Sequence, residues 1–164
     1  MNRSLSVALK YGLFIAGSLI AYFLILRLFN LHDKPWLRLA NGLFMAAGIY
    51  FAIKYYKYKF NADFTYVDGF KTGLLTGFIA TGCFIVFMAV YMFHLDKGFP
   101  ETILKSWFDN TERGGGILIL IILMEGLAST AVLTLTWMQI FKKSQHLGQQ
   151  EHFSENKPKN KTKN

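Results

Sequence analysis

The sequence predicts an all-α integral membrane protein, a bundle of four transmembrane helices. Apolar residues make up 52% of its 164 residues and charged residues only 17%, against about 25% charged residues in soluble proteins. The charges also gather in short clusters that separate long apolar runs. Since a bilayer core about 30 Å thick takes about 20 apolar helical residues to cross, such runs predict membrane spans.

Four segments are long and apolar enough to be spans: residues 11–29, 37–53, 74–93 and 117–141. The first carries Arg27 near its end, the second carries Arg38 near its start, and the last contains one acid, Glu125. Lipid offers no hydrogen-bond partner to the backbone, so each span is expected to be a helix. Residues 1–141 are therefore predicted to form one transmembrane domain.

The basic residues predict the orientation of these spans. Twelve Lys and Arg residues flank the side that holds both termini and the 54–73 loop, whereas six flank the other side. Positive charge is retained in the cytoplasm, so both termini are expected to be cytoplasmic. The polar, Lys-rich segment 142–164 has too few apolar residues to fold and is predicted to be a disordered basic cytoplasmic tail. It lacks the interleaved basic and aromatic residues that would indicate nucleic-acid binding.

The loop after the second span alternates Lys with Tyr. Lys54, Lys57 and Lys59 lie just inside the predicted membrane boundary, where they are expected to anchor the span. The other interpretation is contact with anionic lipid head groups, because each Lys near such a surface contributes about 1 kcal/mol. Asn61 and Asp63 then predict a turn and the N-cap of the third helix.

The loop after the third span contains a short amphipathic pattern. Pro100 suits a first helical position, and five apolar residues fall on one helical face: Phe99, Ile103, Leu104, Trp107 and Phe108. We expect an interfacial helix here, outside the cytoplasm. It would cap the bundle or, alternatively, act as a lid over a cavity.

Small residues predict how the helices pack. Gly69, Gly73 and Gly77 recur every four residues at the start of the third helix, and Gly126 lies in the fourth. Inside lipid the hydrophobic effect does not drive helix association, so close approach across small residues must do so. The pattern is expected to hold a four-helix bundle together, but it would serve a homodimer or another membrane-protein partner equally well.

Glu125 is the ionisable residue that lies well inside a span, about 12 Å past Ile117. An ionised carboxylate at this depth is costly unless it is paired, protonated or hydrated. The residues expected within reach are Arg27, Arg38 and His94. Two interpretations stay open: a structural ion pair or hydrogen bond that fixes the fourth helix, and the proton or cation site of a small transporter.

The sequence shows no catalytic constellation. It lacks the G-x-S-x-G and H-E-x-x-H motifs and a pair of carboxylates in one span. Cys83 has no neighbouring base and is expected to be a packing residue. Four residues of the outer loops, His32, Asp33, His94 and Asp96, lack the spacing of a metal site. The sequence therefore predicts no enzyme and no cofactor.

The segment from Tyr66 to Gly73 carries an aromatic-x-x-Gly-Phe-Lys-x-Gly pattern just before the third span. In this pattern and in its four-span layout the chain resembles a family of small bacterial membrane proteins known only as a domain of unknown function. The resemblance implies the bacterial inner membrane and brings no known activity. The small multidrug transporters also have four spans, but they carry their acid in the first span, where this chain has none.

Two functions follow as hypotheses. The leading one is a non-enzymatic structural or interaction component of the bacterial inner membrane. The alternative is a small proton- or cation-coupled transporter centred on Glu125. A lipid-binding accessory protein that uses the Lys and Tyr residues of the 54–73 loop ranks below both.

Overall fold

The computed structural model describes residues 3–29, 35–60, 64–95, 98 and 114–155. Its regular elements in these ranges are all helices: α1 (Arg3–Leu28), α2 (Pro35–Lys59), α3 (Tyr66–Val90), the π-helical turn η2 (Tyr91–Leu95) and α5 (Gly114–Glu155). No strand occurs in this part of the chain. The predicted all-α class is therefore confirmed.

Three of the helices are long and apolar enough to cross a membrane: Arg3–Leu28, Tyr66–Leu95 and Gly116–Phe141. This composition fits a membrane-embedded protein. The fourth predicted span, 37–53, lies within α2 but stays a prediction. The predicted interfacial helix falls on residues 99–113, which lie outside the described residues.

The helices extend beyond the predicted spans. The largest difference is at the end of α5, which continues to Glu155, where the sequence predicts a disordered tail from residue 142. The segment 142–155 holds several Lys, Gln and Glu residues, which are good helix formers, and the next proline is Pro158. A helix already nucleated in the apolar part of α5 can therefore propagate into it.

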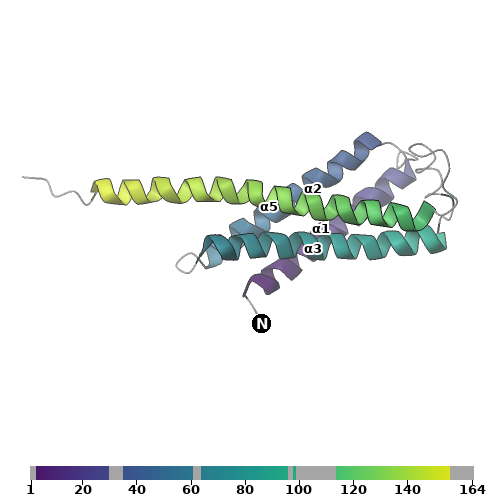
Figure 1. Cartoon of the computed structure of the whole chain (residues 1–164), viewed down its shortest axis with the longest axis horizontal. Coiled ribbons are helices and arrows are strands. Elements are labelled where there is room, and N and C mark those ends of the chain that lie inside the picture. Colours follow the sequence, from purple (N-terminus) through teal and green to yellow (C-terminus); the bar gives the residue numbers. More distant parts are fainter. Residues whose placement is uncertain (1–2, 30–34, 61–63, 96–97, 99–113, 156–164) are drawn as a thin grey trace, which may run out of the picture.

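Two helix pairs make up the bundle. Figure 1 shows α3 and α5 running side by side, with α1 and α2 crossing this pair at an angle. We call the half that holds the start of α1 and of α3 and the end of α2 the terminal half. The half that holds the end of α1, the start of α2, η2 and the start of α5 is the far half. Beyond the terminal half, α5 projects past the other helices.

In the terminal half, α3 and α5 are joined by what we call the Gly–Thr ladder, the pairs Gly73–Thr134, Gly77–Thr130 and Thr81–Gly126. Successive rungs are four residues apart on both helices, as one antiparallel face of two α-helices requires. A Cβ atom at Gly73 would lie only 2.6 Å from Thr134 Cγ2, so each glycine leaves the space that the opposite threonine occupies. Gly69 extends the same row and lies against Met138.

The α1 helix packs on α3 through small residues as well. Ala8, Gly12 and Ala16 are all buried, and a Cβ atom at Gly12 would lie 2.8 Å from Ile79 Cγ2 of α3. In the α1–α2 pair α1 supplies the large side chain instead of the glycine, because Ile15 of α1 fills the notch at Gly48 of α2. Each of these three helix pairs thus approaches closely at a glycine.

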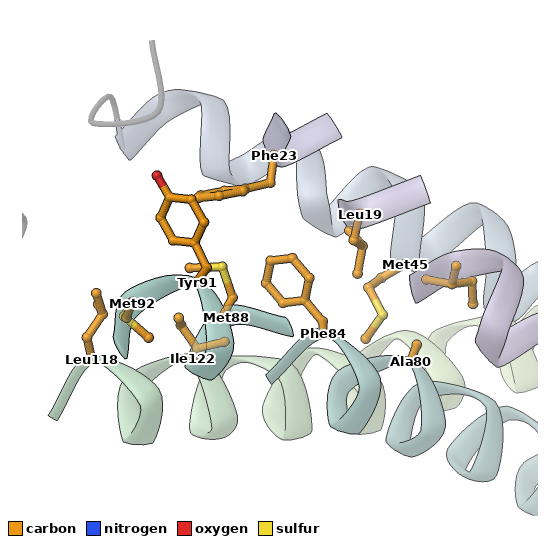
Figure 2. Packing of buried hydrophobic residues seen from close by; sticks show 11 residues of the cluster. Leu19, Phe23, Met45, Ala80, Phe84, Met88, Tyr91, Met92, Leu118 and Ile122 are labelled. Carbon is orange, nitrogen blue, oxygen red and sulfur yellow. The ribbon is translucent and has the colours of Figure 1, made fainter. Parts of the chain in front are cut away.

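The far half is packed by large side chains instead. In Figure 2 Phe84 and Met88 point from α3 toward α1, and Phe23 of α1 faces Tyr91 of η2. The Phe23 and Tyr91 rings meet edge to face with centroids 5.0 Å apart. Tyr91 is 1% exposed, and its N–H donates to the carbonyls of Phe87 and Met88 where the α-helix widens into the π turn.

The N-cap of α3 is Thr65, rather than the predicted Asn61 or Asp63, which lie outside the described residues. Thr65 Oγ1 accepts a hydrogen bond from Asp68 N–H (3.2 Å) and donates to Asp68 Oδ2 (2.7 Å). The residue before it, Phe64, packs against Gly69 one turn into the helix. This apolar contact sets where the helix begins, as in a hydrophobic staple.

Candidate functional site

A cavity of about 190 Å³ lies in the far half, between all four long helices. Its walls are mainly apolar, with Leu19 and Phe23 from α1, Met45 from α2 and Phe84 from α3 among them. It begins where the Gly–Thr ladder ends, because Thr81 and Gly126, which form the last rung, also line it. The last rung of the ladder therefore forms the floor of the cavity on the α3–α5 side.

Four polar side chains line this apolar space: Asn41 from α2, Thr81 from α3, and Glu125 and Ser129 from α5. Two of them carry a buried oxygen, Asn41 Oδ1 and Thr81 Oγ1, that has no hydrogen-bond partner among the described residues. A buried polar atom without a partner costs about 1–3 kcal/mol. The cavity thus concentrates polar groups that the protein itself does not satisfy.

The wall formed by α1 and α2 is held in place by Tyr22. Its hydroxyl donates a 2.9 Å hydrogen bond to the Leu37 carbonyl, and its ring packs on Phe44 with centroids 5.3 Å apart. In the terminal half the corresponding tie joins α2 to α5, where Trp137 Nε1 donates to the Ala46 carbonyl over 2.9 Å. The α2 helix is therefore tied to α5 below the cavity and to α1 beside it.

The residues predicted to surround Glu125 are placed as follows. Glu125 lines the cavity, and the residue as a whole is exposed. The Arg27 guanidinium carbon lies 4.5 Å from the centroid of the Tyr91 ring, in cation–π contact. His94 is exposed on η2. The Arg38 backbone lies in α2, and its side chain is outside the described residues. Within the part of the chain searched, no three His, Cys, Asp or Glu residues gather as metal ligands would.

The lysines predicted to contact lipid head groups lie among aromatic rings at the terminal end. Lys54 Nζ lies 5.5 Å from the Tyr50 ring centroid, Lys57 Nζ 5.5 Å from Phe141, and Lys59 Nζ 5.9 Å from Tyr55. Such contacts hold the ammonium groups over the rings at the level where a bilayer interface is expected.

The polar residues Asn41, Thr81 and Ser129 are not among the site residues predicted from the sequence. A signal for them was present, because each is a polar residue in a predicted span. Which face of its helix each one occupies depends on how the helices pack, and Thr81 and Ser129 are also ordinary small packing residues.

The chain matches the profile of a family described as "Protein of unknown function (DUF4199)" over residues 10–143. The chain therefore belongs to this family, and the resemblance inferred from its layout is confirmed at the level of a domain of unknown function. No curated protein and no solved structure matches it.

Proposed function

We propose that this chain is a non-enzymatic structural or interaction component of the bacterial inner membrane, with four spans and both termini in the cytoplasm. In this arrangement α2 crosses the bilayer beside α1, to which the Tyr22–Leu37 hydrogen bond and the Tyr11–Tyr55 ring contact tie it near both ends. The distribution of basic residues supports the orientation.

The Gly–Thr ladder is the observation that carries this proposal. Thr130 and Thr134 follow Glu125 on α5 and would be the polar residues of a pathway toward the terminal end. Both are fully buried, and they fill the notches opposite Gly77 and Gly73. The polar groups below the cavity therefore serve helix packing, which favours a closed bundle over a transporter.

The projecting part of α5 supports an interaction role. The helix continues past Phe141, where its apolar segment ends, to Glu155, beyond the ends of the other helices (Figure 1). We propose that a partner meets this extended helical segment on the same side as the N-terminus.

The small-residue stripes of α1 and α3 are used inside the chain, against α3 and α5 respectively. A homodimer formed through these stripes would have to displace existing contacts. We therefore propose a partner that meets the projecting part of α5 or another face of the bundle.

The basic and aromatic cluster at the end of α2 supports a second, compatible role in binding anionic lipid. Lys54 and Lys59 are exposed, so their ammonium groups can reach head groups while their stems lie along the rings. Vesicles with and without an anionic lipid would test this role, because binding of the purified chain to lipid should fall when both lysines are replaced by glutamine.

Topology tests the arrangement of spans. In a Cys83→Ser background, Trp107→Cys should react with an impermeant thiol reagent in intact cells, whereas Lys159→Cys should react only after permeabilisation. The reverse pattern would overturn the orientation. Labelling of both positions from outside would show that α5 does not span.

Flux measurements separate the two function classes. Proteoliposomes that contain the chain should show no proton or alkali-cation flux at any pH if it is a structural component. A pH-dependent flux that is lost in Glu125→Gln, with the variant still folded, would overturn the proposal and establish the transporter.

A further inference from the structure

We propose that the far-half cavity takes up the end of one acyl chain of a membrane phospholipid. This goes beyond the proposed structural role and rests on one part of it, the embedding of the bundle in a bilayer. It is separate from head-group binding by the lysines at the end of α2, which lie in the terminal half. The place where the cavity opens, its length and its lining all point to this occupant.

The cavity opens sideways between α2 and α5. Among its lining residues Leu39 of α2 and Glu125 of α5 are exposed, whereas those from α1 and α3 are buried or half-buried. The hydrogen bond from Trp137 to the Ala46 carbonyl joins α5 to α2 on the terminal side of this opening. In Figure 1 α2 then diverges from α5 toward the far half. The mouth therefore lies on the outer surface of the bundle, where membrane helices meet lipid.

The depth of the mouth selects the end of the chain. On α5 the residues beside it are Glu125 and Ser129, which lie about 12 and about 18 Å past Ile117 at the start of the predicted span. The middle of a hydrocarbon core about 30 Å thick lies about 15 Å from its edge. The mouth is therefore near the middle of the bilayer, where the methyl ends of acyl chains lie and head groups do not.

The length and volume of the cavity suit a chain end. Its lining residues extend from Leu19 to Leu26 on α1 and from Thr81 to Met88 on α3, about two turns and about 10 Å along each helix. Its volume is about 190 Å³. Since an apolar cavity of about 150 Å³ holds one benzene molecule, this one has room for about eight carbon atoms. An extended chain end can follow the helix axes through this space, whereas a whole lipid does not fit.

The walls suit a hydrocarbon rather than water. Met45, Phe84 and Met88 are buried and line the cavity from α2 and α3, and Figure 2 shows their side chains gathered between the helices. The oxygens Asn41 Oδ1 and Thr81 Oγ1 are buried and not open to the cavity. Water needs several polar partners to stay in such a space, whereas methylene groups gain dispersion contacts with every apolar wall atom.

Photolabelling of the full chain in phospholipid vesicles tests the proposal. The probe is a phosphatidylcholine with a diazirine at the methyl end of one acyl chain, and its adducts are located by peptide mass spectrometry. Met88 and Ile122 line the cavity and are 3% and 8% exposed, so lipid on the outer surface does not reach them, and both should be labelled. Val86 and Leu120 are exposed on the same two helices and report labelling by the surrounding lipid.

The four labelled positions separate the possible failures. Labelling of Val86 and Leu120 without Met88 and Ile122 would show that the helices are embedded but that no chain enters, which overturns the proposal alone. No labelling at any of the four would overturn the proposed membrane role as well. Labelling of Met88 and Ile122 by a small aromatic diazirine, but not by the lipid, would assign the cavity to a free small molecule instead.

A second lipid tests which part of the chain enters. With the diazirine next to the carbonyl group, the probe should label Leu120, which lies about 4 Å past Ile117, and should leave Met88 and Ile122 unlabelled. Equal labelling of Met88 and Ile122 by the two lipids would contradict entry by the methyl end.

A pair of glycine variants locates the occupied space. Gly42 lines the cavity, and a Cβ atom there meets nothing within 4 Å, so Gly42→Leu should fill the space and abolish labelling of Met88 and Ile122. Gly82 is equally open but does not line the cavity, so Gly82→Leu should be labelled as the wild type is. Labelling of Val86 should be equal in all three proteins. If Met88 and Ile122 are still labelled in a folded Gly42→Leu, the proposal fails; if that variant does not fold, the two lipid probes on the unmodified chain decide.

Discussion

The two halves of the bundle use the same pair of helices in opposite ways. In the terminal half α3 and α5 meet through the Gly–Thr ladder, and the opposing threonines are fully buried. In the far half the same helices present Phe84, Met88, Leu118 and Ile122, which pack into one apolar cluster. Small residues allow two backbones to approach closely, whereas large ones hold them apart. The cavity begins where one kind of packing gives way to the other.

The contrast teaches where stability and binding are separated in this molecule. Within a membrane, contact between apolar side chains gains little over contact with lipid, so close packing in the terminal half is what favours the folded bundle. Buried oxygens without partners among the described residues occur in both halves, at Thr134 Oγ1 in the ladder and at Asn41 Oδ1 and Thr81 Oγ1 beside the cavity, and each is unfavourable. What sets the far half apart is the cavity that its larger side chains leave between the helices.

The largest effect is expected from a substitution that breaks the Gly–Thr ladder. Gly77→Leu places a side chain where Thr130 lies, so α3 and α5 must separate. We expect a loss of about 3 kcal/mol in the free energy of unfolding, measured by denaturation in mild detergent. Gly82→Leu, on the same helix in open space, is the matched control and should be no less stable than the wild type.

A swapped rung tests whether the pairing itself matters. Gly77→Thr combined with Thr130→Gly exchanges the two residues across the ladder, as the Thr81–Gly126 rung already does. The double variant should recover most of the stability lost in Gly77→Thr alone. No recovery would show that the position of each glycine on its own helix, rather than its pairing, sets the stability.

The next largest effects are expected from removing the hydrogen bonds that hold α2, one in each half. Trp137→Phe removes the hydrogen bond to the Ala46 carbonyl, and Tyr22→Phe removes the one to the Leu37 carbonyl. Each should cost about 1 kcal/mol of unfolding free energy.

Much of the fold follows from the sequence because the length of an apolar run alone predicts a spanning helix. The position of the α3 N-cap was predicted less well, since Asn61, Asp63 and Thr65 are all good N-cap residues. The contact of Phe64 with Gly69 selects among them. The helical extension of α5 to Glu155 was not predicted either, because its polar composition alone resembles disorder.

The candidate site was predicted only in part. Glu125 stands out in any span because a charge in lipid is costly, and it does line the cavity. The other polar residues of the cavity were not predictable, because Asn41 and Thr81 come from other helices whose rotation is set by packing. Arg27 was expected near Glu125 from its depth, and that proximity stays a prediction. Its place over the Tyr91 ring depends on the π turn of η2.

A smaller effect of opposite sign is expected in the far half. Gly42→Leu adds a side chain in open space and replaces glycine by a better helix former, which is worth up to about 1 kcal/mol. The variant should therefore unfold at the same or a higher denaturant concentration than the wild type, although it blocks the cavity. A destabilised Gly42→Leu would show that the space is not free to be filled.

The smallest effect is expected from substitutions that show which atoms of a ladder threonine contribute to stability. In all three rungs the threonine atom nearest to a Cβ on the facing glycine is the methyl carbon Cγ2, and Thr134 Oγ1 has no hydrogen-bond partner among the described residues. Thr134→Val keeps the methyl and should therefore change the free energy of unfolding by less than about 0.5 kcal/mol. Thr134→Ser keeps the hydroxyl, loses the methyl that fills the notch at Gly73, and should cost about 1 kcal/mol. The reverse order of the two variants in thermal unfolding would mean that a hydroxyl hydrogen bond, rather than shape, joins the helices at this rung.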